Sequence, residues 1–407
     1  MNVDVAIVGG GLVGASLALA LEPTGLKVAL VEGVAPDASA QPSFDDRTTA
    51  LGNGTRRTFE ALGVWSQIAP QAAAIRHIHV SDAGRYGFAR LAAEEHGIEA
   101  FGYVVTNRCL GAALRAGLAR LPQLELRMPA ECTAVTLGES SVTVATRPGA
   151  QPLHAKLVVA ADGAQSRVRE AAGLAAAVED YGQVAIVAHV RASRPADGTA
   201  FERFTPTGPF AVLPLYDGAY GVVWTLTPQA AERVLALSDA AYLAELQQAF
   251  GWRIGRVEAV GRRNAYPLRL TRATQLTGPR VVLIGNAAQG LHPVAGQGFN
   301  LGLRDAATLA ELLAETVRHG AGRADVGAPE VLTEFAARRA ADRDGVTRFT
   351  DGLVKLFGDT RPGVPLLRDL GLLLFDLSPT AKQALSRLSV GFAGRIPRLG
   401  RGLGVMS

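Results

Sequence analysis

Three nearly uninterrupted apolar runs of strand length divide the chain, and each is followed by a turn that contains glycine. They are Val3–Val8, Leu157–Ala160 and Val281–Ile284. Such runs are typical of strands that are buried on both faces of a sheet. Helical patterns at Ala15–Leu21 and Leu303–Val317 follow the first and the third turn. Strands that alternate with helices predict an α/β fold.

A different pattern covers Tyr181–Leu226, where apolar and polar residues alternate. This alternation is typical of antiparallel strands. The strands predicted here are Gln183–Arg191, Thr199–Phe204, Phe210–Leu215 and Tyr220–Leu226. An amphipathic helix is predicted at Ser238–Phe250, with Ser238 as its cap, and a further strand at Arg256–Leu268. We expect Arg76–Ala100 to add strands to the same block.

The last part of the chain is predicted to be helical. Glu330–Phe349 carries closely spaced charges, including Arg339, Asp342 and Arg343, which indicates a solvated helix face. From Pro362 onward, leucines and basic residues are mixed. Such a segment favours an anionic membrane surface, and a helix packed on the rest of the chain or on another protein explains it equally well.

These patterns divide the chain into three predicted regions. Residues 1–75, 101–180 and 262–345 are expected to form a discontinuous α/β domain. Residues 76–100 and 181–261 are expected to form a domain of mainly antiparallel sheet. Residues 346–407 are expected to form a helical C-terminal region.

Composition narrows the class of protein. The 407 residues are 48% hydrophobic and 19% charged, which allows a large core and excludes a disordered chain. The net charge of +4 comes without a basic and aromatic stripe, so no nucleic acid is expected as a partner. Cys109 and Cys132 lack metal-ligand spacing, which excludes a disulfide scaffold and favours a reducing compartment. His77, His79 and His96 fit surface or core positions better than metal ligands, so no metal is expected.

Neither a leader segment nor a membrane span is expected. Met1 leads directly into a strand, without a basic segment and a cleavage site. The two long uncharged runs, Val5–Leu21 and Val281–Leu303, are broken by glycines. This interruption favours buried strand–turn–helix units over membrane spans.

The first turn carries a dinucleotide-binding pattern. Gly9, Gly11 and Gly14 form G-x-G-x-x-G between a strand and a helix, and Glu32 ends the next strand. The glycines permit a tight turn that brings the helix N-terminus close to a pyrophosphate, and Glu32 can accept hydrogen bonds from ribose hydroxyls. The alternative is a glycine-rich turn without a ligand.

Two further turns carry candidate chemistry. Asp162-Gly163 follows the second apolar run, and alone it fits an ordinary turn with an aspartate cap equally well. The turn that begins at Gly285 and extends to Gly302 connects a strand to a helix, where backbone amides can approach a polar ligand closely. Two glycine-rich turns so far apart in the chain suggest one large dinucleotide that is held at both ends.

In the order of these motifs, the chain resembles the class A flavin-dependent aromatic hydroxylases, the para-hydroxybenzoate-hydroxylase-like superfamily. Within it, the chain is most similar to the hydroxylases of ubiquinone biosynthesis and to their UbiH branch. The stretches that carry the resemblance are residues 46–51, 201–205, 208–209, 213–214, 266–268 and 285–305, and the likeness covers nearly the whole chain. It implies a Rossmann-like FAD-binding domain, an inserted antiparallel substrate domain and a helical C-terminal tail.

The resemblance also assigns cofactor contacts. The residues expected to bind FAD are Gly9, Gly11, Gly14, Glu32, Arg47, Asn107, Arg108, Asp162, Gly163, Gly285, Asn286, Gly298, Phe299 and Asn300, with Asn107 and Arg108 as alternatives for one contact. The residues expected around the flavin ring are His292, Pro293, Gly296, Gln297 and Gly298. A helix N-terminus there would stabilise negative charge on the reduced ring. Most of the superfamily has Asp and His where this chain, like the UbiH branch, has Asn286 and Gln289; Asn286 keeps an acceptor and loses a charge.

The implied reaction inserts one oxygen atom into the ring of a polyprenylated phenol similar to 2-polyprenyl-6-methoxyphenol, through a flavin C4a-hydroperoxide. FAD is the implied cofactor, and O2 and NADPH, or an external electron donor, are the co-substrates. A base that deprotonates the phenol would help. His292, Tyr216 and Tyr266 are candidates, although a structural role explains each of them better. The residues expected to line the substrate pocket are Phe204, Phe210, Leu213, Trp224 and Tyr266.

The resemblance further implies other ubiquinone-biosynthesis proteins as partners. It implies a cytoplasmic location. Peripheral contact of the C-terminal region with the inner face of the membrane, and a homo-oligomer, are left open. Two other functions remain as alternatives. One is a class A hydroxylase of a different, soluble aromatic compound, and the other is a flavin-binding structural subunit of the biosynthetic assembly.

Overall fold

The three apolar runs are neighbouring strands of one sheet. The computed structural model describes residues 1–35, 47–148, 151–292, 296–320, 324–359, 361, 363–378 and 395–406. In it, β1 (Asn2–Val8) pairs in parallel with β2 (Val28–Val31) on one side and with β11 (Leu153–Ala160) on the other. Strand β11 pairs in parallel with β19 (Val281–Leu283). Because the carboxyl ends of parallel strands meet at one edge of a sheet, the turns after β1, β11 and β19 lie together.

Other strands extend this sheet, whose order is β18–β19–β11–β1–β2–β8. The additional strands are β8 (Glu125–Arg127) and β18 (Thr277–Gly278). A hairpin of β9 (Glu131–Leu137) and β10 (Val142–Arg147) joins the sheet where β10 pairs antiparallel with β11. The parallel strands therefore occupy its centre, where apolar residues are shielded on both faces.

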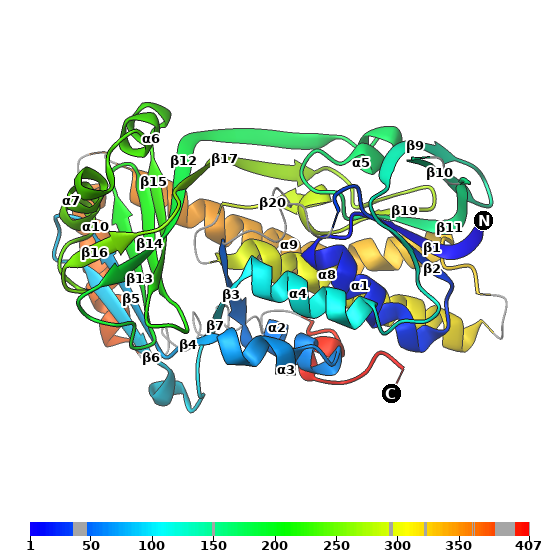
Figure 1. Ribbon diagram of the computed structural model, residues 1–407, viewed down its shortest axis with the longest axis horizontal. Coiled ribbons are helices and arrows are strands. Elements are labelled where there is room, and N and C mark those ends of the chain that lie inside the picture. The colour runs from blue at the N-terminus through cyan, green and yellow to red at the C-terminus, as the bar shows by residue number, and fades with distance from the viewer. Residues whose placement is uncertain are drawn as a thin grey trace.

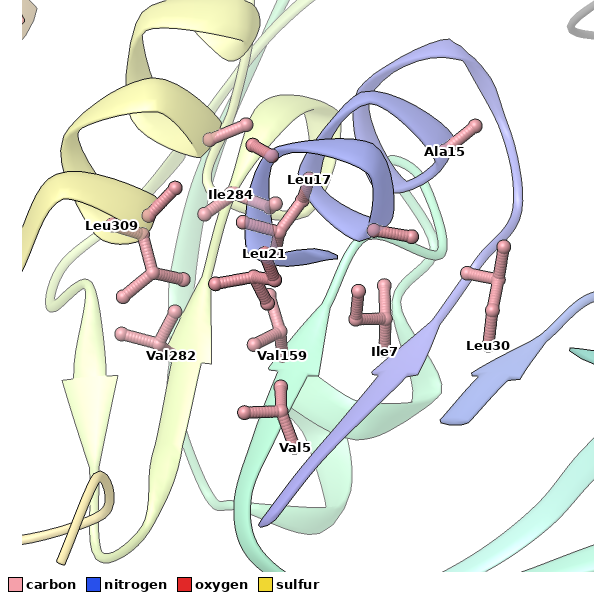
Figure 2. Close-up of a cluster of buried hydrophobic side chains, with 14 of the residues drawn as sticks. Val5, Ile7, Ala15, Leu17, Leu21, Leu30, Val159, Val282, Ile284 and Leu309 are labelled. Carbon is pink, nitrogen blue, oxygen red and sulfur yellow. The ribbon is translucent and has the colours of Figure 1, made fainter. Parts of the chain in front are cut away.

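Helix α1 covers one face of this sheet, between α4 and α8 (Figure 1). The bounds of these helices are Leu12–Leu21, Asn107–Leu118 and Gln297–His319. Figure 2 shows Leu17 and Leu21 of α1 above Ile7 and Val159 of the sheet, and all four side chains are fully buried. Burial of one such side chain contributes about 1.5–3 kcal/mol. This layer fixes α1, and with it the turn that precedes α1.

The alternating part of the chain forms a second sheet, in the order β20–β17–β12–β15–β14–β13–β5–β6, with β16 paired to β12. Its strands are β5 (His77–Asp82), β6 (Phe88–Ala92), β12 (Ala176–Ala192), β13 (Thr199–Thr205), β14 (Gly208–Pro214), β15 (Tyr220–Leu226), β16 (Val257–Val260), β17 (Asn264–Ala273) and β20 (Gln289–Gly290). The four strands predicted between residues 183 and 226 are confirmed, whereas the strand predicted at 256–268 is two strands. β5 and β6 come from the segment 76–100, and β5 pairs in parallel with β13.

Two helices cover one face of the second sheet. They are α6 (Pro228–Leu235) and α7 (Asp239–Phe250). The predicted cap is confirmed, because the Ser238 hydroxyl accepts a hydrogen bond from the backbone N–H of Ala241. The α7 side chains that are fully buried are Tyr242, Leu246 and Phe250. The opposite face of the sheet is left for the site described below.

The long strands β12 and β17 connect the two sheets (Figure 1). Two of the predicted domain boundaries, after residues 180 and 345, lie inside continuous elements, β12 and α9. The predicted α/β domain therefore shares backbone hydrogen bonds with the sheet domain and one long helix with the C-terminal region. The division into domains stays a prediction.

Smaller elements complete the fold. A third sheet has the order β3–β7–β4. Its strands and the short helices are β3 (Thr48–Gly52), β4 (Ala73–Ile75), β7 (Gly102–Thr106), α2 (Asn53–Ala61), α3 (Trp65–Ile68) and α5 (Arg167–Ala171). Short 3-10 turns occupy Glu22–Thr24, Ala69–Gln71, Ala93–His96, Gly285–Ala287 and Leu399–Arg401.

The C-terminal helices are α9 (Pro329–Gly358) and α10 (Val364–Leu377). The prediction that α9 presents a solvated charged face here is wrong for Arg339, Asp342 and Arg343, which are buried. Residues three and four positions apart share one face of a helix, and this face packs on α8. Close spacing of opposite charges does not by itself distinguish a solvated face from a buried ion-pair network.

Arg339 is the centre of this network. Its guanidinium donates from Nε to Asp305 Oδ1 at 2.7 Å and from Nη1 to Asp342 Oδ2 at 2.6 Å. Arg304 adds a second cation at 2.8 Å from Asp342. Burial alone would raise the pKa of Asp342, but Arg304 and Arg339 hold it below its usual value. The network joins α8 to α9 inside the protein.

Replacement of Arg339 by Met should therefore destabilise the protein strongly. The substitution leaves the buried Asp305 carboxylate without its cation, which costs about 3–5 kcal/mol in the free energy of unfolding. Urea unfolding of both proteins measures this difference. The matched control is Arg233→Met, because Arg233 forms an exposed ion pair with Glu245 and its loss should change little. Equal effects of the two substitutions would contradict the role of the network.

Candidate functional site

The three turns border one cavity of about 1360 Å³. Its walls are the turn edge of the first sheet and the face of the second sheet that α6 and α7 leave uncovered. Lining residues from the turns include Gly11, Gly163, Gly285 and Asn286. A typical small-molecule site occupies about 300–1,000 Å³. The cavity is therefore large enough for a dinucleotide together with a second ligand.

The first turn requires glycine at two positions. Gly9 has φ of +104°, and a Cβ there would lie 2.3 Å from the carbonyl oxygen of Ala161. A Cβ at Gly14 would lie 1.9 Å from the carbonyl oxygen of Gly9. The turn is thus pressed against the end of β11 and against the start of α1. The N-terminus of α1, with Gly11 and Leu12 in the cavity wall, presents backbone amides to a bound anion.

Glu32 lies beside this turn at the end of β2. Its carboxylate accepts hydrogen bonds from the backbone N–H groups of Gly10, at 2.7 Å, and Val34, at 2.8 Å. These bonds hold the acceptor next to the motif, which is where the ribose of a dinucleotide would need it. The ribose contact stays a prediction.

Asp162 supplies a buried acceptor that the protein does not satisfy. Its Oδ2 accepts from the backbone N–H of Val168 at 3.2 Å, whereas its buried Oδ1 has no hydrogen-bond partner among the described residues. Burial raises the pKa of this carboxyl group. Buried polar atoms usually have a partner, but Asp162 is not among the lining residues, although its neighbours Ala161 and Gly163 are, so a ligand contact of this carboxylate stays a prediction. The site fits FAD because the glycines that no side chain could replace bring a helix N-terminus to the wall of a cavity of this size.

The third turn is held from behind by α8. Asp305 Oδ2 accepts from the backbone N–H of Gly285 at 3.2 Å and from Nε2 of Gln289 at 2.7 Å. Arg343 donates to the carbonyl oxygens of Ala273 and Ala288. The site motifs alone did not reveal these roles for Asp305 and Arg343. Gln289, where most of the superfamily has His, thus supports the turn, while Asn286 is exposed and lines the cavity.

Residues at the start of α8 also border the cavity. Gly296, Gln297, Gly298, Phe299 and Asn300 line it. Pro293, expected beside the flavin ring, lies outside the described residues. The Asn300 side chain accepts from the backbone N–H of Gly52 at 2.9 Å and from Thr55 Oγ1 at 2.6 Å, and it donates to the carbonyl oxygens of Ala50 and Gly296. Its amide therefore joins α8 to β3 and α2, and a flavin contact of this residue stays a prediction.

The opposite wall comes from β3, α4 and β17. Asn107 is buried, lines the cavity and accepts a hydrogen bond from Thr49 Oγ1 at 2.7 Å. Arg108 is exposed and is not among the lining residues, so Asn107 is the better placed of the two alternatives, and its contact with FAD stays a prediction. Arg47 and Tyr266 both line the cavity, with the guanidinium 4.7 Å from the ring centre of Tyr266.

His292 lines the cavity and has a strongly lowered pKa. It is only 1% exposed, and burial lowers its pKa from 6.5 to about 4. Gln183 donates from Nε2 to the carbonyl oxygen of Thr207, so its Oε1 accepts from His292 Nε2 at 3.3 Å. The imidazole is therefore neutral at pH 7 and is a weak base. Tyr216, another candidate base, is exposed and does not line the cavity, whereas Tyr266 does.

The expected substrate residues lie on two faces of the second sheet. Phe204, Leu213 and Tyr266 line the cavity. Phe210 and Trp224 do not, which corrects the expectation: their rings stack 5.2 Å apart in the core under α7, where Trp224 also meets Tyr242. Successive side chains of a strand point to opposite faces, and aromatic residues occupy both faces here. Among the described residues, no group of three or more His, Cys, Asp or Glu side chains could hold a metal ion.

A first prediction concerns the turn after β1. Gly14→Ala should abolish cofactor retention, because the added Cβ would overlap the carbonyl oxygen of Gly9 and force the turn away from the pyrophosphate position. Flavin absorbance per mole of purified protein measures retention. Gly345→Ala is the matched control, since a Cβ at that position has open space. Stoichiometric flavin in the Gly14 variant would contradict the assignment.

A second prediction concerns pH. The pKa of His292 is about 4 in the folded protein, below its ordinary 6.5, so the unfolded chain binds more protons between these values. Stability should fall as the pH falls through this range. Between pH 7 and 4.5, the free energy of unfolding, measured with urea, should fall by about 2–3 kcal/mol less in His292→Gln than in the unchanged protein. His77→Gln, at an exposed position, controls for the loss of an imidazole, and an unchanged pH dependence in the His292 variant would overturn the explanation.

Comparison with known proteins shows the family of this chain. The family model described as FAD binding domain matches residues 2–348. The ubiquinone hydroxylase UbiL of Rhodospirillum rubrum is 40% identical over 98% of this chain and 93% of its own length. The 3-demethoxyubiquinol 3-hydroxylase of Escherichia coli is 31% identical over 95% of this chain and 98% of its own length.

Solved structures confirm the predicted fold class. The crystal structure of p-nitrophenol 4-monooxygenase PnpA from Pseudomonas putida DLL-E4 aligns with a TM-score of 0.80 over 97% of this chain and 99% of that one, at 21% sequence identity. This likeness shows the fold alone, whereas the family model and the relatives above show the family. The chain belongs to the FAD-binding-domain family of flavin-dependent aromatic monooxygenases, which use FAD as cofactor and a reduced nicotinamide and O2 as co-substrates.

Proposed function

We propose that this protein hydroxylates the aromatic ring of a polyprenylated phenol, similar to 2-polyprenyl-6-methoxyphenol, in ubiquinone biosynthesis. The observation that carries the proposal is a single cavity that unites the FAD turns with a long apolar wall. A soluble aromatic compound would leave much of that wall in contact with water. Relatives named as ubiquinone hydroxylases, which align over nearly the whole chain, support the same class of substrate.

Bound FAD would activate O2 and supply the oxygen atom to the ring. The protein contributes position, electrostatics and the exclusion of water. The N-terminus of α8 borders the cavity at Gln297 and Gly298, and the positive end of its helix dipole stabilises negative charge there. Ala211, Leu213 and Val223 of the second sheet cover the opposite side with apolar surface, which keeps bulk water from the reacting groups.

The proposed setting includes partners and a membrane. We propose that NADPH or an external electron donor reduces the flavin, and that other proteins of ubiquinone biosynthesis bind this chain. In the described part of the chain, no helix has both the length and the apolar character needed to cross a bilayer. Peripheral contact through the C-terminal region is proposed for access to a substrate that dissolves in lipid. Lys382 and Arg387, part of the predicted basic apolar tail, lie outside the described residues.

Oxygen transfer tests the proposal directly. Purified, FAD-loaded protein is supplied with a short-chain 2-prenyl-6-methoxyphenol, NADPH and 18O-labelled O2, and the product is analysed by mass spectrometry. One labelled oxygen on the ring is the expected result and identifies the carbon. The matched control replaces the labelled gas with labelled water, which should give no labelled product.

Two other outcomes would overturn the proposal. Oxygen transfer to phenols without a prenyl chain, with none to the prenylated phenol, would favour a hydroxylase of soluble aromatics. Retained flavin without any labelled product, even when a chemical reductant replaces NADPH, would favour a flavin-binding structural subunit.

A further inference from the structure

Helix α10 turns its charged residues toward the protein. Arg368 contacts Asp82 of β5 at 2.6 Å, and both side chains are buried. Asp369 lies 3.5 Å from Arg85, and Asp376 accepts from the backbone N–H of Arg90 at 2.7 Å. These contacts attach α10 to the hairpin of β5 and β6, at the end of the molecule that the second sheet occupies (Figure 1).

Backbone contact makes this attachment close. A Cβ at Gly87, between β5 and β6, would lie 2.8 Å from the Cα atom of Asp369 and 2.7 Å from its Oδ1. Only glycine leaves room for α10 at this point. This close contact and the ion pairs together fix the position of α10 on the hairpin.

Four leucines of α10 point the other way. Leu366 is 71% exposed, Leu367 69%, Leu370 52% and Leu374 58%. A surface helix normally buries its apolar stripe and exposes its charges. This helix shows the reverse arrangement along its exposed side, and a row of exposed leucines of this kind usually marks a binding function.

The cavity reaches this row. Beyond the cofactor turns it is lined by the end of α9, at Leu353, Leu356 and Phe357, and by α10, at Leu367 and Leu372. Leu356 and Leu367 are lining residues and are also exposed to solvent, at 48% and 69%. The cavity therefore opens to the surface between the end of α9 and α10. We call this opening, formed by Leu353, Leu356, Phe357, Leu367 and Leu372, the apolar mouth.

Chemistry restricts what the apolar mouth can accept. All five side chains are hydrocarbon. Arg368, the charged residue that α10 contributes to the lining, is engaged by Asp82 and by the carbonyl oxygens of Leu356 and Phe357. A polar ligand would find few partners, whereas a hydrocarbon gains about fourfold in affinity for each methylene that leaves water. The leucine row continues the apolar surface outward from the mouth.

We propose that the apolar mouth binds the isoprenoid chain of the substrate, which passes from the ring in the cavity outward to Leu367 of α10. This proposal rests on the proposed function and deepens it, because it assigns the chain to residues of α9 and α10. The expected sequence of contacts is ring against the flavin side of the cavity, first isoprene units against the mouth, and later units on the surface.

Two neighbouring leucines provide a matched test. Leu367 and Leu366 are almost equally exposed, but only Leu367 lines the cavity. Leu367→Asp should weaken binding of a farnesyl-substituted 2-methoxyphenol by about tenfold relative to 2-methoxyphenol without a chain. Leu366→Asp should leave the ratio of the two affinities unchanged. Titration calorimetry with FAD-loaded protein measures both dissociation constants, and flavin content checks that each variant is folded.

Three results would overturn the proposal. Equal effects of the two substitutions on the ratio of the affinities would mean that chain binding does not depend on the cavity opening at Leu367. No effect of Leu367→Asp on the ratio of the two affinities would mean that the isoprenoid chain does not bind in the mouth. Equal affinities of the unchanged protein for the chainless phenol and the farnesyl compound would also mean that the mouth does not bind the chain. Because these are binding measurements, failure of the proposed hydroxylation is recorded separately, by the absence of labelled product.

Discussion

The carboxylate of Asp305 is the contact on which the cofactor side of the molecule depends. One of its oxygens accepts from Gly285 and Gln289 in the turn after β19, and the other accepts from Arg339 of α9. A charge at this depth persists only when its hydrogen bonds and its counter-ion are all present. The position of the turn is therefore coupled to the docking of α9, a helix that contains none of the cofactor motifs. Arg343 strengthens the same coupling through Ala288.

Much of the fold could be predicted because its signals are local. Apolar runs followed by glycine identified β1, β11 and β19, and the geometry of parallel strands brought their turns together. Gly14 and Glu32 could be assigned because one unit of strand, turn, helix and strand contains both. The Asp305–Arg339 pair could not be assigned in this way. Its members lie on different helices, and a charged helix face has the same spacing whether water or another helix covers it.

On the substrate side, too, local sequence signals did not show which apolar residues would lie in the core and which would line the cavity. Alternation predicted the strands of the second sheet, but it did not show which face α6 and α7 would cover. Phe210 and Leu213 belong to one strand, and only Leu213 reaches the cavity. The exposed leucines of α10 reverse the usual rule that apolar residues lie inside. Their place became clear only from the ion pairs that hold the opposite side of the helix against β5 and β6.

The order of strands in the first sheet also governs how the protein is made. β1 is complete after the first residues are synthesised, but its partner β11 begins at Leu153 and β19 at Val281. At about 5–20 residues per second, the ribosome needs roughly 15–55 seconds between β1 and β19. β2 follows the N-terminal glycine turn at once, but for about the first half of that interval β1 lacks its other neighbour, β11, and throughout it β11 lacks β19. The nascent chain must therefore keep its most apolar segments from aggregating, and it can acquire its flavin only after the turn that follows β19 has emerged.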